Sequence, residues 1–235
     1  MRNLKTLGLA LVAAFALSAV VASAASAETA HFTVQGIGAG ETAGVKGTQV
    51  GSPTNTFTKN GLTMTCATAT VTGKALSTGP EPSTITLEPT YSGCHVVIAG
   101  LTKTVTVTMN GCAYIYRATK NTESVAFSAD LTIECEVAGP KKIEIHTYST
   151  AGTEVGTTCT TDITPHQTIT GTIQLTNEPA ATPDDILAHI NVTFPVHNTI
   201  QGALCGQNAI ESTTWHGTFT LQGLKGGSPV HTTIS

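Results

Sequence analysis

Apolar and polar residues alternate along most of the chain, and the clearest alternation runs from Leu101 to Met109. In that segment threonine occupies every second position, and the positions between are mostly aliphatic. Successive side chains of a β-strand point to opposite faces, so the segment predicts a strand with one apolar face and one face of hydroxyl groups. Such a strand is typical of an antiparallel sheet that buries one face. A Gly-Cys pair lies beyond each end, at Gly93-Cys94 and Gly111-Cys112.

Similar alternating segments, separated by turn residues, predict strands throughout the chain. The strongest hairpin signal is Asn60-Gly61 between two such segments, because Asn-Gly supplies the positive φ angles of a type I′ turn. Pro195 should confine its strand to a sheet edge or end it, since proline has no N–H to donate. Besides this hairpin and the strand after Leu101, we expect strands within residues 31–36, 84–91, 113–117, 124–136, 141–148, 167–176, 186–196 and 213–222.

Composition supports an all-β fold. About one residue in five is threonine, which favours extended backbone, and only 11% of the residues are charged. We therefore predict an antiparallel β-sandwich of the Greek-key, immunoglobulin-like kind, stapled by disulfides. The chain has no fixed-period repeat, which argues against a solenoid or propeller. We expect a single domain over residues 28–235; the alternative is two disulfide-coupled halves that meet near residue 119.

Residues 1–27 have the features of a secretory signal peptide. Arg2 and Lys5 form a basic start, an apolar segment follows, and small-residue sites occur at Ala22–Ala24 and Ala25–Ala27. Cleavage after Ala27 would leave nine basic and fifteen acidic residues, a net charge of −6 with histidine neutral. We predict a secreted protein, with or without attachment to the cell envelope, and no membrane-spanning segment after cleavage.

The charge pattern and the motifs limit the kinds of partner that we expect. Apart from Lys141-Lys142 the sequence has no basic patch, so nucleic acid is not an expected partner. No zinc-ligand spacing, Gly-x-Ser-x-Gly motif or calcium-loop motif occurs, and we predict no cofactor and no metal site. A cell-envelope polymer or a carbohydrate is the partner class that stays open.

Six cysteines in a secreted chain predict three disulfides. Residues at equal distances from a hairpin turn face each other, as a disulfide requires. Cys66 and Cys94 flank one turn-rich segment symmetrically, and Cys112 and Cys135 flank another. These spacings suggest Cys66–Cys94 and Cys112–Cys135, which leaves Cys159 with Cys205.

The signal peptide, Asn60-Gly61, Thr90–Cys94, Met109–Tyr114 and Gly217–Thr220 together give the chain a family resemblance. It resembles a group of small, Thr-rich secreted β proteins that occur in many copies in soil actinobacteria. The resemblance implies an exported, disulfide-containing β protein, and it carries over no functional residue.

Three groups of residues are candidates for a functional site. The threonines at 102–108 invite an ice- or mineral-binding interpretation, which needs a flat Thr ladder across neighbouring strands; solvent-facing Thr on an ordinary strand is the simpler interpretation. His189 and His197 lie an even number of positions apart on one predicted strand, so their side chains would point to the same face. Surface histidines are the simpler interpretation. Asp184 and Asp185 with Glu178 offer oxygen ligands but lack calcium-loop spacing.

Hydrolysis and sugar binding would depend on different residues. Glycoside hydrolysis needs two carboxylates, and the acids on or beside predicted strands are Glu88, Glu134, Glu136 and Glu144. Sugar-binding sites stack sugars on exposed aromatic rings, and Trp215, the single tryptophan, is the ligand-binding residue that we select; a buried core Trp is the competing interpretation.

The sequence contains no catalytic constellation, so we predict a non-catalytic extracellular or cell-surface module with a structural, adhesive or ligand-binding role. The first alternative is a secreted hydrolase that acts on glycans. The second is an ice- or mineral-binding surface.

Overall fold

The computed structural model describes residues 30–38, 40–51, 55–76, 84–119, 127–136, 142–148, 157–167, 169–178, 185–200 and 210–235. These residues contain seventeen strands, every strand pairing among them is antiparallel, and no helix occurs among them. The strands are β1 (Phe32–Val34), β2 (Thr42–Gln49), β3 (Thr56–Lys59), β4 (Leu62–Thr65), β5 (Thr68–Leu76), β6 (Thr84–Ser92), β7 (Cys94–Ile98), β8 (Leu101–Thr108), β9 (Cys112–Thr119), β10 (Phe127–Cys135), β11 (Ile143–Tyr148), β12 (Thr157–Ile163), β13 (Thr170–Glu178), β14 (Asp185–Ile200), β15 (Ile210–Lys225), β16 (Ser228–Val230) and β17 (Thr232–Ile234).

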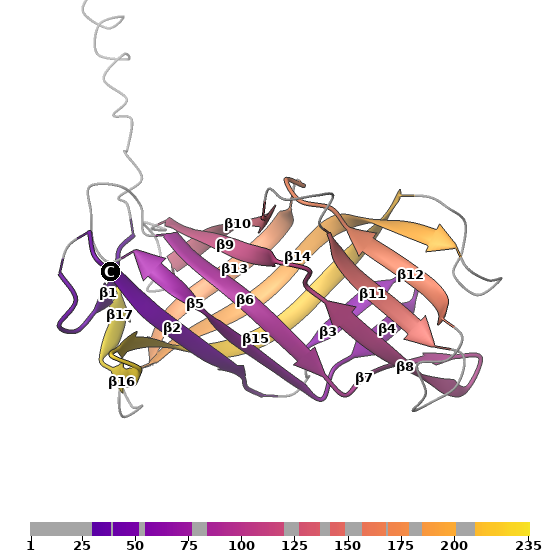
Figure 1. Ribbon diagram of the computed structural model, residues 1–235, viewed down its shortest axis with the longest axis horizontal. Helices are drawn as coiled ribbons and strands as arrows, with labels where there is room; N and C mark the ends of the chain where they lie inside the picture. The colour runs from indigo at the N-terminus through magenta and orange to yellow at the C-terminus, as the bar shows by residue number, and fades with distance from the viewer. Residues whose placement is uncertain are drawn as a thin grey trace, which may run out of the picture.

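Fifteen strands form one continuous sheet that closes on itself twice. The first ring of hydrogen-bonded strands is β2-β5-β6-β9-β10-β13-β14-β15, closed because β15 pairs with both β14 and β2. The second ring is β3-β4-β7-β8-β11-β12-β14-β15, closed because β15 also pairs with β3. The two rings share β14 and β15 and lie end to end along them (Figure 1).

The chain alternates between the rings. From β2 in the first ring it passes to the β3–β4 hairpin of the second, then to β5–β6, β7–β8, β9–β10 and β11–β12 in turn, and returns with β13. Each passage crosses the boundary between the rings, which we call the waist. β4 and β5 are therefore successive halves of one long path through the molecule, as are β6 and β7.

Left-handed backbone conformations interrupt the strands at the waist. Gly93 has φ 60° between β6 and β7, and Asn110 and Gly111 have φ 50° and 75° between β8 and β9. A Cβ on Gly93 would lie 2.8 Å from the Ala67 side chain, so this crossing favours glycine twice over. The Asn-Gly sequence that ends the Leu101 strand therefore marks a passage between rings.

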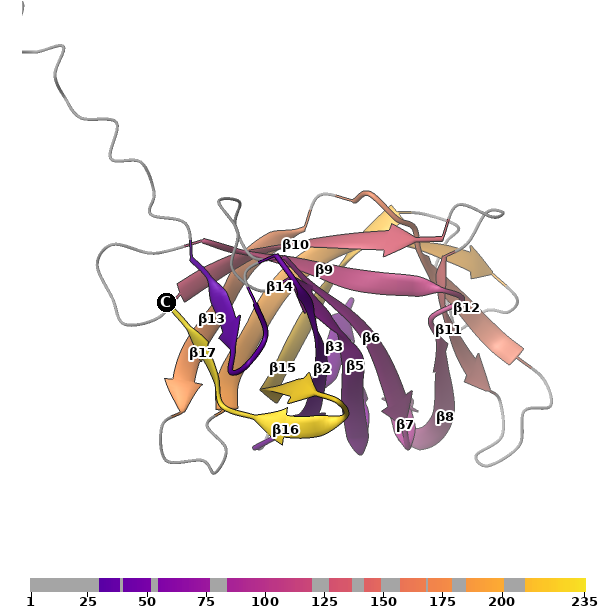
Figure 2. The same cartoon turned by 60° about the vertical axis from the view of Figure 1, so that its left-hand side comes forward.

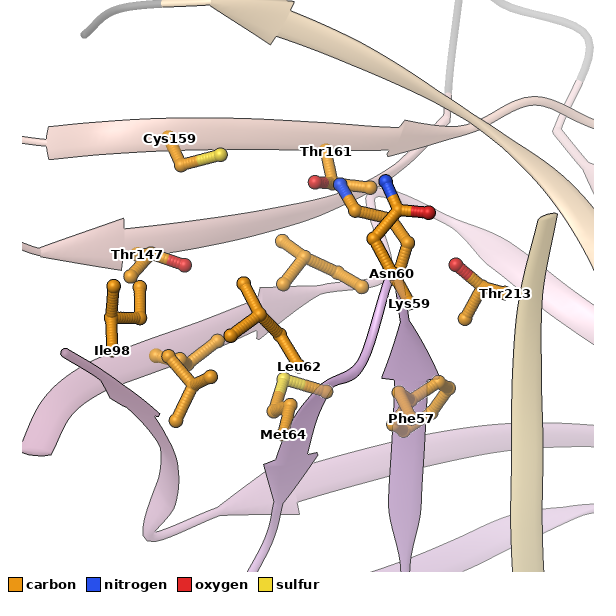
Figure 3. Close-up of a pocket in the computed structure, with 13 residues that line it drawn as sticks. Phe57, Lys59, Asn60, Leu62, Met64, Ile98, Thr147, Cys159, Thr161 and Thr213 are labelled. Carbon is orange, nitrogen blue, oxygen red and sulfur yellow. The ribbon is translucent and has the colours of Figure 1, made fainter. Parts of the chain in front are cut away.

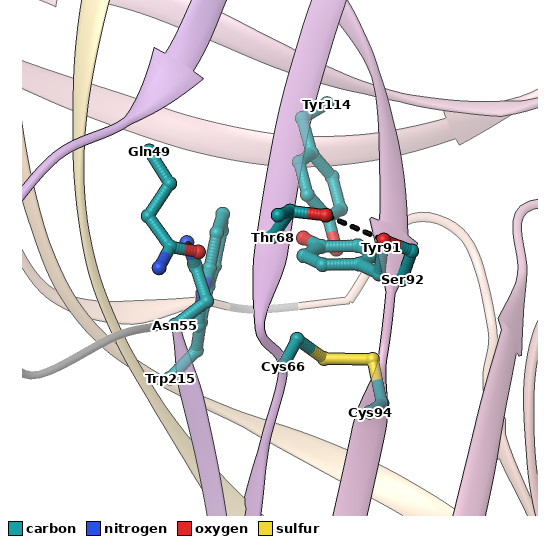
Figure 4. Close-up of a disulfide and its surroundings, with 9 residues drawn as sticks. All are labelled: Gln49, Asn55, Cys66, Thr68, Tyr91, Ser92, Cys94, Tyr114 and Trp215. Carbon is teal, nitrogen blue, oxygen red and sulfur yellow. Dashed lines mark hydrogen bonds between the residues drawn. A yellow bond between two sulfur atoms is a disulfide. The ribbon is translucent and has the colours of Figure 1, made fainter.

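Two predicted disulfides are confirmed, and both lie at the waist. Cys66 and Cys94 are bonded across the β4–β5 and β6–β7 crossings (Figure 4). Cys112 and Cys135, at the start of β9 and the end of β10, are bonded beside the β8–β9 and β10–β11 crossings. Cys159 is disulfide-bonded as well, and Cys205, its predicted partner, lies outside the described residues.

The expectation for Pro195 is wrong. β14 continues through it to Ile200, and Pro195 stands opposite Ser212 of β15. On its other side, β14 pairs with β13 as far as Thr193 and with β12 only from His197. Pro195 thus lies between the two ladders on that side of β14. Its missing N–H therefore breaks no hydrogen bond to β12 or β13.

A small separate sheet covers one end of the first ring. β1 pairs with β17, and both strands lie at the end opposite the second ring (Figure 1); Figure 2 shows β17 at the same end. The Asn177 side chain of β13 donates to the Ile234 carbonyl at 2.7 Å and accepts from its N–H at 2.8 Å. Phe32 and Ile234 are almost fully buried in the core. This end of the molecule is therefore packed with side chains.

The all-β, antiparallel, disulfide-bonded architecture is confirmed, and the Asn60-Gly61 hairpin is present with φ 49° and 76°. The Greek-key, immunoglobulin-like sandwich is not confirmed, because the pairings form one closed sheet. β9, which ends at Thr119, pairs with β10 along its whole length, and the number of domains stays a prediction. Residues 1–27 lie outside the described residues, and within the described part no helix is long and apolar enough to cross a membrane.

Candidate functional site

The second ring contains a cavity of about 200 Å³ that is partly open to solvent (Figure 3). Its wall comes from all the strands of the second ring except β14, together with the β3–β4 turn. The apolar part of the lining is Phe57, Leu62, Met64, Val96, Ile98, Val105 and Ile145. The polar part is Lys59, Asn60, Thr147, Thr161 and Thr213, and Cys159 also lines the cavity.

The alternation of the sequence explains this lining. Inward positions two residues apart come from single strands: Phe57 with Lys59 on β3, and Leu62 with Met64 on β4. The threonines between them point away from the cavity, as the period of two requires. A closed sheet of about eight strands leaves an interior that side chains fill or that holds one small ligand. Here the side chains leave room.

One side of the cavity is polar because four strands converge there. Lys59 of β3 lies 3.5 Å from the Glu211 carboxylate of β15, and its ammonium also donates to the Asn198 side chain of β14. Glu211 accepts hydrogen bonds of 2.6 Å from the side chains of Asn60 and Asn198. The Thr161 hydroxyl of β12 donates to Asn198 at 3.0 Å. We call Lys59, Asn60, Asn198 and Glu211 the polar cluster.

Burial shapes the electrostatics of this cluster. The side chains of Lys59 and Glu211 are only 18% and 20% exposed. Burial lowers the pKa of Lys59, and the Glu211 carboxylate partly opposes that shift. Burial alone would raise the pKa of Glu211, but the two amides and the Lys59 ammonium outweigh it and lower that pKa. Paired as ammonium and carboxylate 3.5 Å apart, the two side chains add no net charge to this side of the cavity.

Thr213 of β15 has a hydroxyl without a partner. The residue is 3% exposed, and its Oγ1 makes no hydrogen bond with any described group. Figure 3 shows its side chain pointing from β15 into the cavity, on the side of Asn60. A buried hydroxyl left without a partner costs about 1–3 kcal/mol, so this position favours a hydrogen-bonding occupant of the cavity, either water or a ligand.

An aromatic cluster separates this cavity from the interior of the first ring. Phe57 lines the cavity and stacks on Trp215, with ring centroids 5.7 Å apart. Trp215 also contacts Phe219, a residue of the first ring's interior, at 6.4 Å and Tyr114 at 5.1 Å. The cavity found in that interior measures about 10 Å³. Of these two interior cavities, the larger one lies in the second ring.

Trp215 lies at the centre of this cluster. It is 1% exposed, and its indole N–H donates to the Asn55 side chain at 2.8 Å (Figure 4). Asn55 in turn donates to Gln49 at 2.9 Å. The indole presents no exposed face on which a sugar could stack. A ligand-binding role for Trp215 stays a prediction, and the structure places the ring one side chain behind the cavity wall.

The histidines singled out from the sequence lie on the outer face. His189 and His197 are both exposed on β14, eight positions apart, which separates them by roughly 26 Å along a strand. His189 lies 3.2 Å from the Thr218 hydroxyl, beside an open outer hollow of about 290 Å³ that His216 also lines. Within the described ranges no group of three or more His, Cys, Asp or Glu side chains could hold a metal ion.

The acidic residues are scattered. Glu178 and Asp185 face each other across β13 and β14, while Asp184 lies outside the described residues. Glu144 is 3.4 Å from Lys142, which is also 2.7 Å from Asp162; those contacts raise the pKa of Lys142, the Asp162 hydrogen bond most.

The other carboxylates considered for glycoside hydrolysis also lie outside the cavity lining. Glu134 pairs with His166 at 3.2 Å, and Glu88 is exposed on the first ring. Neither of them, nor Glu136 or Glu144, is among the described residues that line the cavity.

A threonine row does cross neighbouring strands, at residues other than those expected. The threonines 102, 104 and 106 of β8 face Val97, His95 and His146, so no ladder forms there. A row of five in register instead spans β13, β14, β15, β3 and β4, formed by Thr170, Thr193, Thr214, Thr58 and Thr63. Because these strands belong to closed, twisted rings, the row follows a curved surface.

Comparison of the chain with protein-family models, curated proteins and solved structures finds no match.

Proposed function

We propose that this protein is an exported, non-catalytic binding module that holds one small, mainly apolar molecule in the cavity of the second ring. The observation that carries the proposal is the contrast between two interior cavities: about 200 Å³ in the second ring and about 10 Å³ in the first. A cavity of about 150 Å³ lined by aliphatic and aromatic groups holds benzene. The expected ligand is therefore somewhat larger than benzene.

The proposal of export is supported by disulfides as well as by the N-terminal sequence. Disulfides persist in oxidising compartments outside the cytosol, and Cys66–Cys94 and Cys112–Cys135 are present. Attachment to the cell envelope, binding to a polymer or carbohydrate, and kinship with Thr-rich actinobacterial proteins stay predictions from the sequence.

The two alternatives have less support. For a glycan hydrolase, the described carboxylates do not gather at the cavity, and Glu211 is held in an ion pair with Lys59. For an ice- or mineral-binding surface, the threonine row has the register but follows a curved sheet, and several of its hydroxyls bond to each other, as Thr58 does to Thr63 at 3.0 Å. A ligand held in the cavity requires neither feature.

Two methionines allow a direct test. Met64 lines the cavity and Met109 does not. With ¹³C-methyl-labelled methionine, we expect ethylbenzene to shift the Met64 methyl resonance saturably and to leave that of Met109 in place. Val105→Phe fills the cavity and should abolish the shift, whereas Thr102→Phe adds the same ring at an exposed position of the same strand and should not.

A Met64 resonance that does not respond to ethylbenzene, or a response that survives Val105→Phe, would contradict the proposal.

A further inference from the structure

The polar side of the cavity indicates what kind of ligand it accepts. Lys59 is the one charged side chain among the described lining residues, and its charge is already matched by Glu211 at 3.5 Å. The Asn198 side chain, fully buried beside them, accepts from Lys59 and Thr161 and donates to Glu211. A negatively charged ligand would find no unmatched cation here.

An unmatched charge in a poorly solvated site costs more than an unmatched neutral group. A carboxylate in the cavity would have to displace Glu211 from Lys59 and from the amides of Asn60 and Asn198. A neutral ligand leaves those contacts intact. The arrangement therefore favours an uncharged molecule over an anion.

Thr213 supplies the remaining polar contact. Its hydroxyl is buried, has no partner among the described groups, and points into the cavity. A hydroxyl can donate to a carbonyl oxygen or exchange hydrogen bonds with an alcohol. Apart from Thr147, Thr161 and Cys159, the rest of the lining is aliphatic or aromatic. It is formed by Val96, Ile98, Val105 and Ile145 together with Leu62, Met64 and Phe57.

Resting on the proposed function, we infer that the second ring selects a neutral, mainly apolar molecule that carries one carbonyl or hydroxyl group, and that Thr213 recognises that group. Simple ketones, esters and alcohols with an aromatic or short aliphatic body belong to this class. Thr213 is thus a residue that determines specificity, and the Lys59–Glu211 pair excludes anions.

Three probes of similar shape test the inference through the Met64 methyl resonance: ethylbenzene, acetophenone and benzoate. One net hydrogen bond corresponds to an affinity gain of up to about tenfold. We expect acetophenone to bind wild-type protein several-fold to about tenfold more tightly than ethylbenzene, and benzoate to bind more weakly than either.

Two substitutions separate the contributions. Thr213→Val should remove the preference for acetophenone and leave ethylbenzene binding unchanged or slightly stronger. Its control is Thr214→Val, which deletes a hydroxyl from the outward-facing neighbour on the same strand and should leave all three affinities unchanged. Glu211→Gln leaves Lys59 unmatched and should raise the affinity for benzoate at least several-fold.

The outcomes are distinct. If ethylbenzene and acetophenone bind wild-type protein equally, or if Thr213→Val weakens both alike, Thr213 does not read the polar group. Benzoate as the tightest wild-type ligand would overturn the assignment of a neutral ligand. If none of the three probes binds, the proposed function fails and this inference fails with it.

Discussion

The two rings contain equal numbers of strands and share β14 and β15, yet one interior is filled and the other holds a cavity. Large side chains, including Tyr116, Phe219 and several leucines, line the first interior. The second interior is lined partly by smaller residues, among them Val96, Val105 and Thr213. Strand number sets the size of a closed sheet, and side-chain volume then decides whether the space inside is occupied.

The ends of the rings differ as well. The β1–β17 sheet covers the far end of the first ring with buried residues such as Phe32 and Ile234. At the far end of the second ring, the tips of the β3–β4 and β7–β8 hairpins carry exposed apolar residues, with Leu62 36% exposed and Leu101 60% exposed. The first ring is therefore closed by packed side chains at its far end, whereas the second ring presents exposed apolar side chains there.

The largest expected effect comes from removing the partition between the two interiors. Trp215→Ala should destabilise the protein by about 3–5 kcal/mol, because it empties a buried volume between Phe57 and Phe219. Chemical denaturation followed by circular dichroism measures the change. Trp215→Phe, which keeps a ring, should cost clearly less. A loss below about 1 kcal/mol for the alanine variant would show that the partition is not a packed element.

The two waist disulfides should contribute about equally to the stability of the fold, but only one of them should affect ligand binding. Replacing either pair with alanines should cost about 3 kcal/mol, since the bonds close loops with sequence separations of 28 and 23. Cys66–Cys94 adjoins β4 and β7, which carry Met64 and Val96, so its loss should also weaken ethylbenzene binding. Loss of Cys112–Cys135, which joins β9 to β10, should not. Equal effects on binding would contradict the division of roles between the rings.

A matched enlargement compares the interiors directly. Val71 lines the first interior and Val105 the second, and both are 4% exposed. Val71→Phe should destabilise by about 1–3 kcal/mol through overpacking, whereas Val105→Phe should be close to neutral because its ring enters free space. Thermal unfolding of both variants checks the difference. Comparable destabilisation would mean that the second interior collapses around its lining and leaves no free space for the added ring.

The smallest effect is the pH dependence of the polar cluster. The pKa of Glu211 is lowered in the folded protein, so its carboxylate stabilises the fold above the unfolded pKa and loses that contribution as the pH falls through the folded value. Glu211→Gln should therefore cost about 1 kcal/mol or less near neutral pH, and the difference from wild type should close in acid. Glu88→Gln, at an exposed position of the first ring, is the control. A gap that widens in acid would contradict the ion pair.

Local sequence patterns determined much of the fold. Alternation with a period of two placed the strands, and Asn60-Gly61 specified a hairpin because few other residues adopt two positive φ angles. The spacing of Cys66, Cys94, Cys112 and Cys135 gave the two described disulfides, because facing residues on antiparallel segments lie close enough to bond. These features depend on neighbours in the chain.

The tertiary structure decided the rest. Closure of the sheet depends on which strands pair across long separations, and the alternation is the same for a sandwich and for two rings. It also decided that Pro195 falls in a gap between ladders and that Trp215 is buried. The sequence analysis missed Lys59 and Thr213, which line the cavity, and Glu211, which pairs with Lys59. Lys59 belongs to β3, whereas Glu211 and Thr213 belong to β15, far along the chain from β3. Only packing in three dimensions brings an unpartnered hydroxyl and a matched ion pair to one wall.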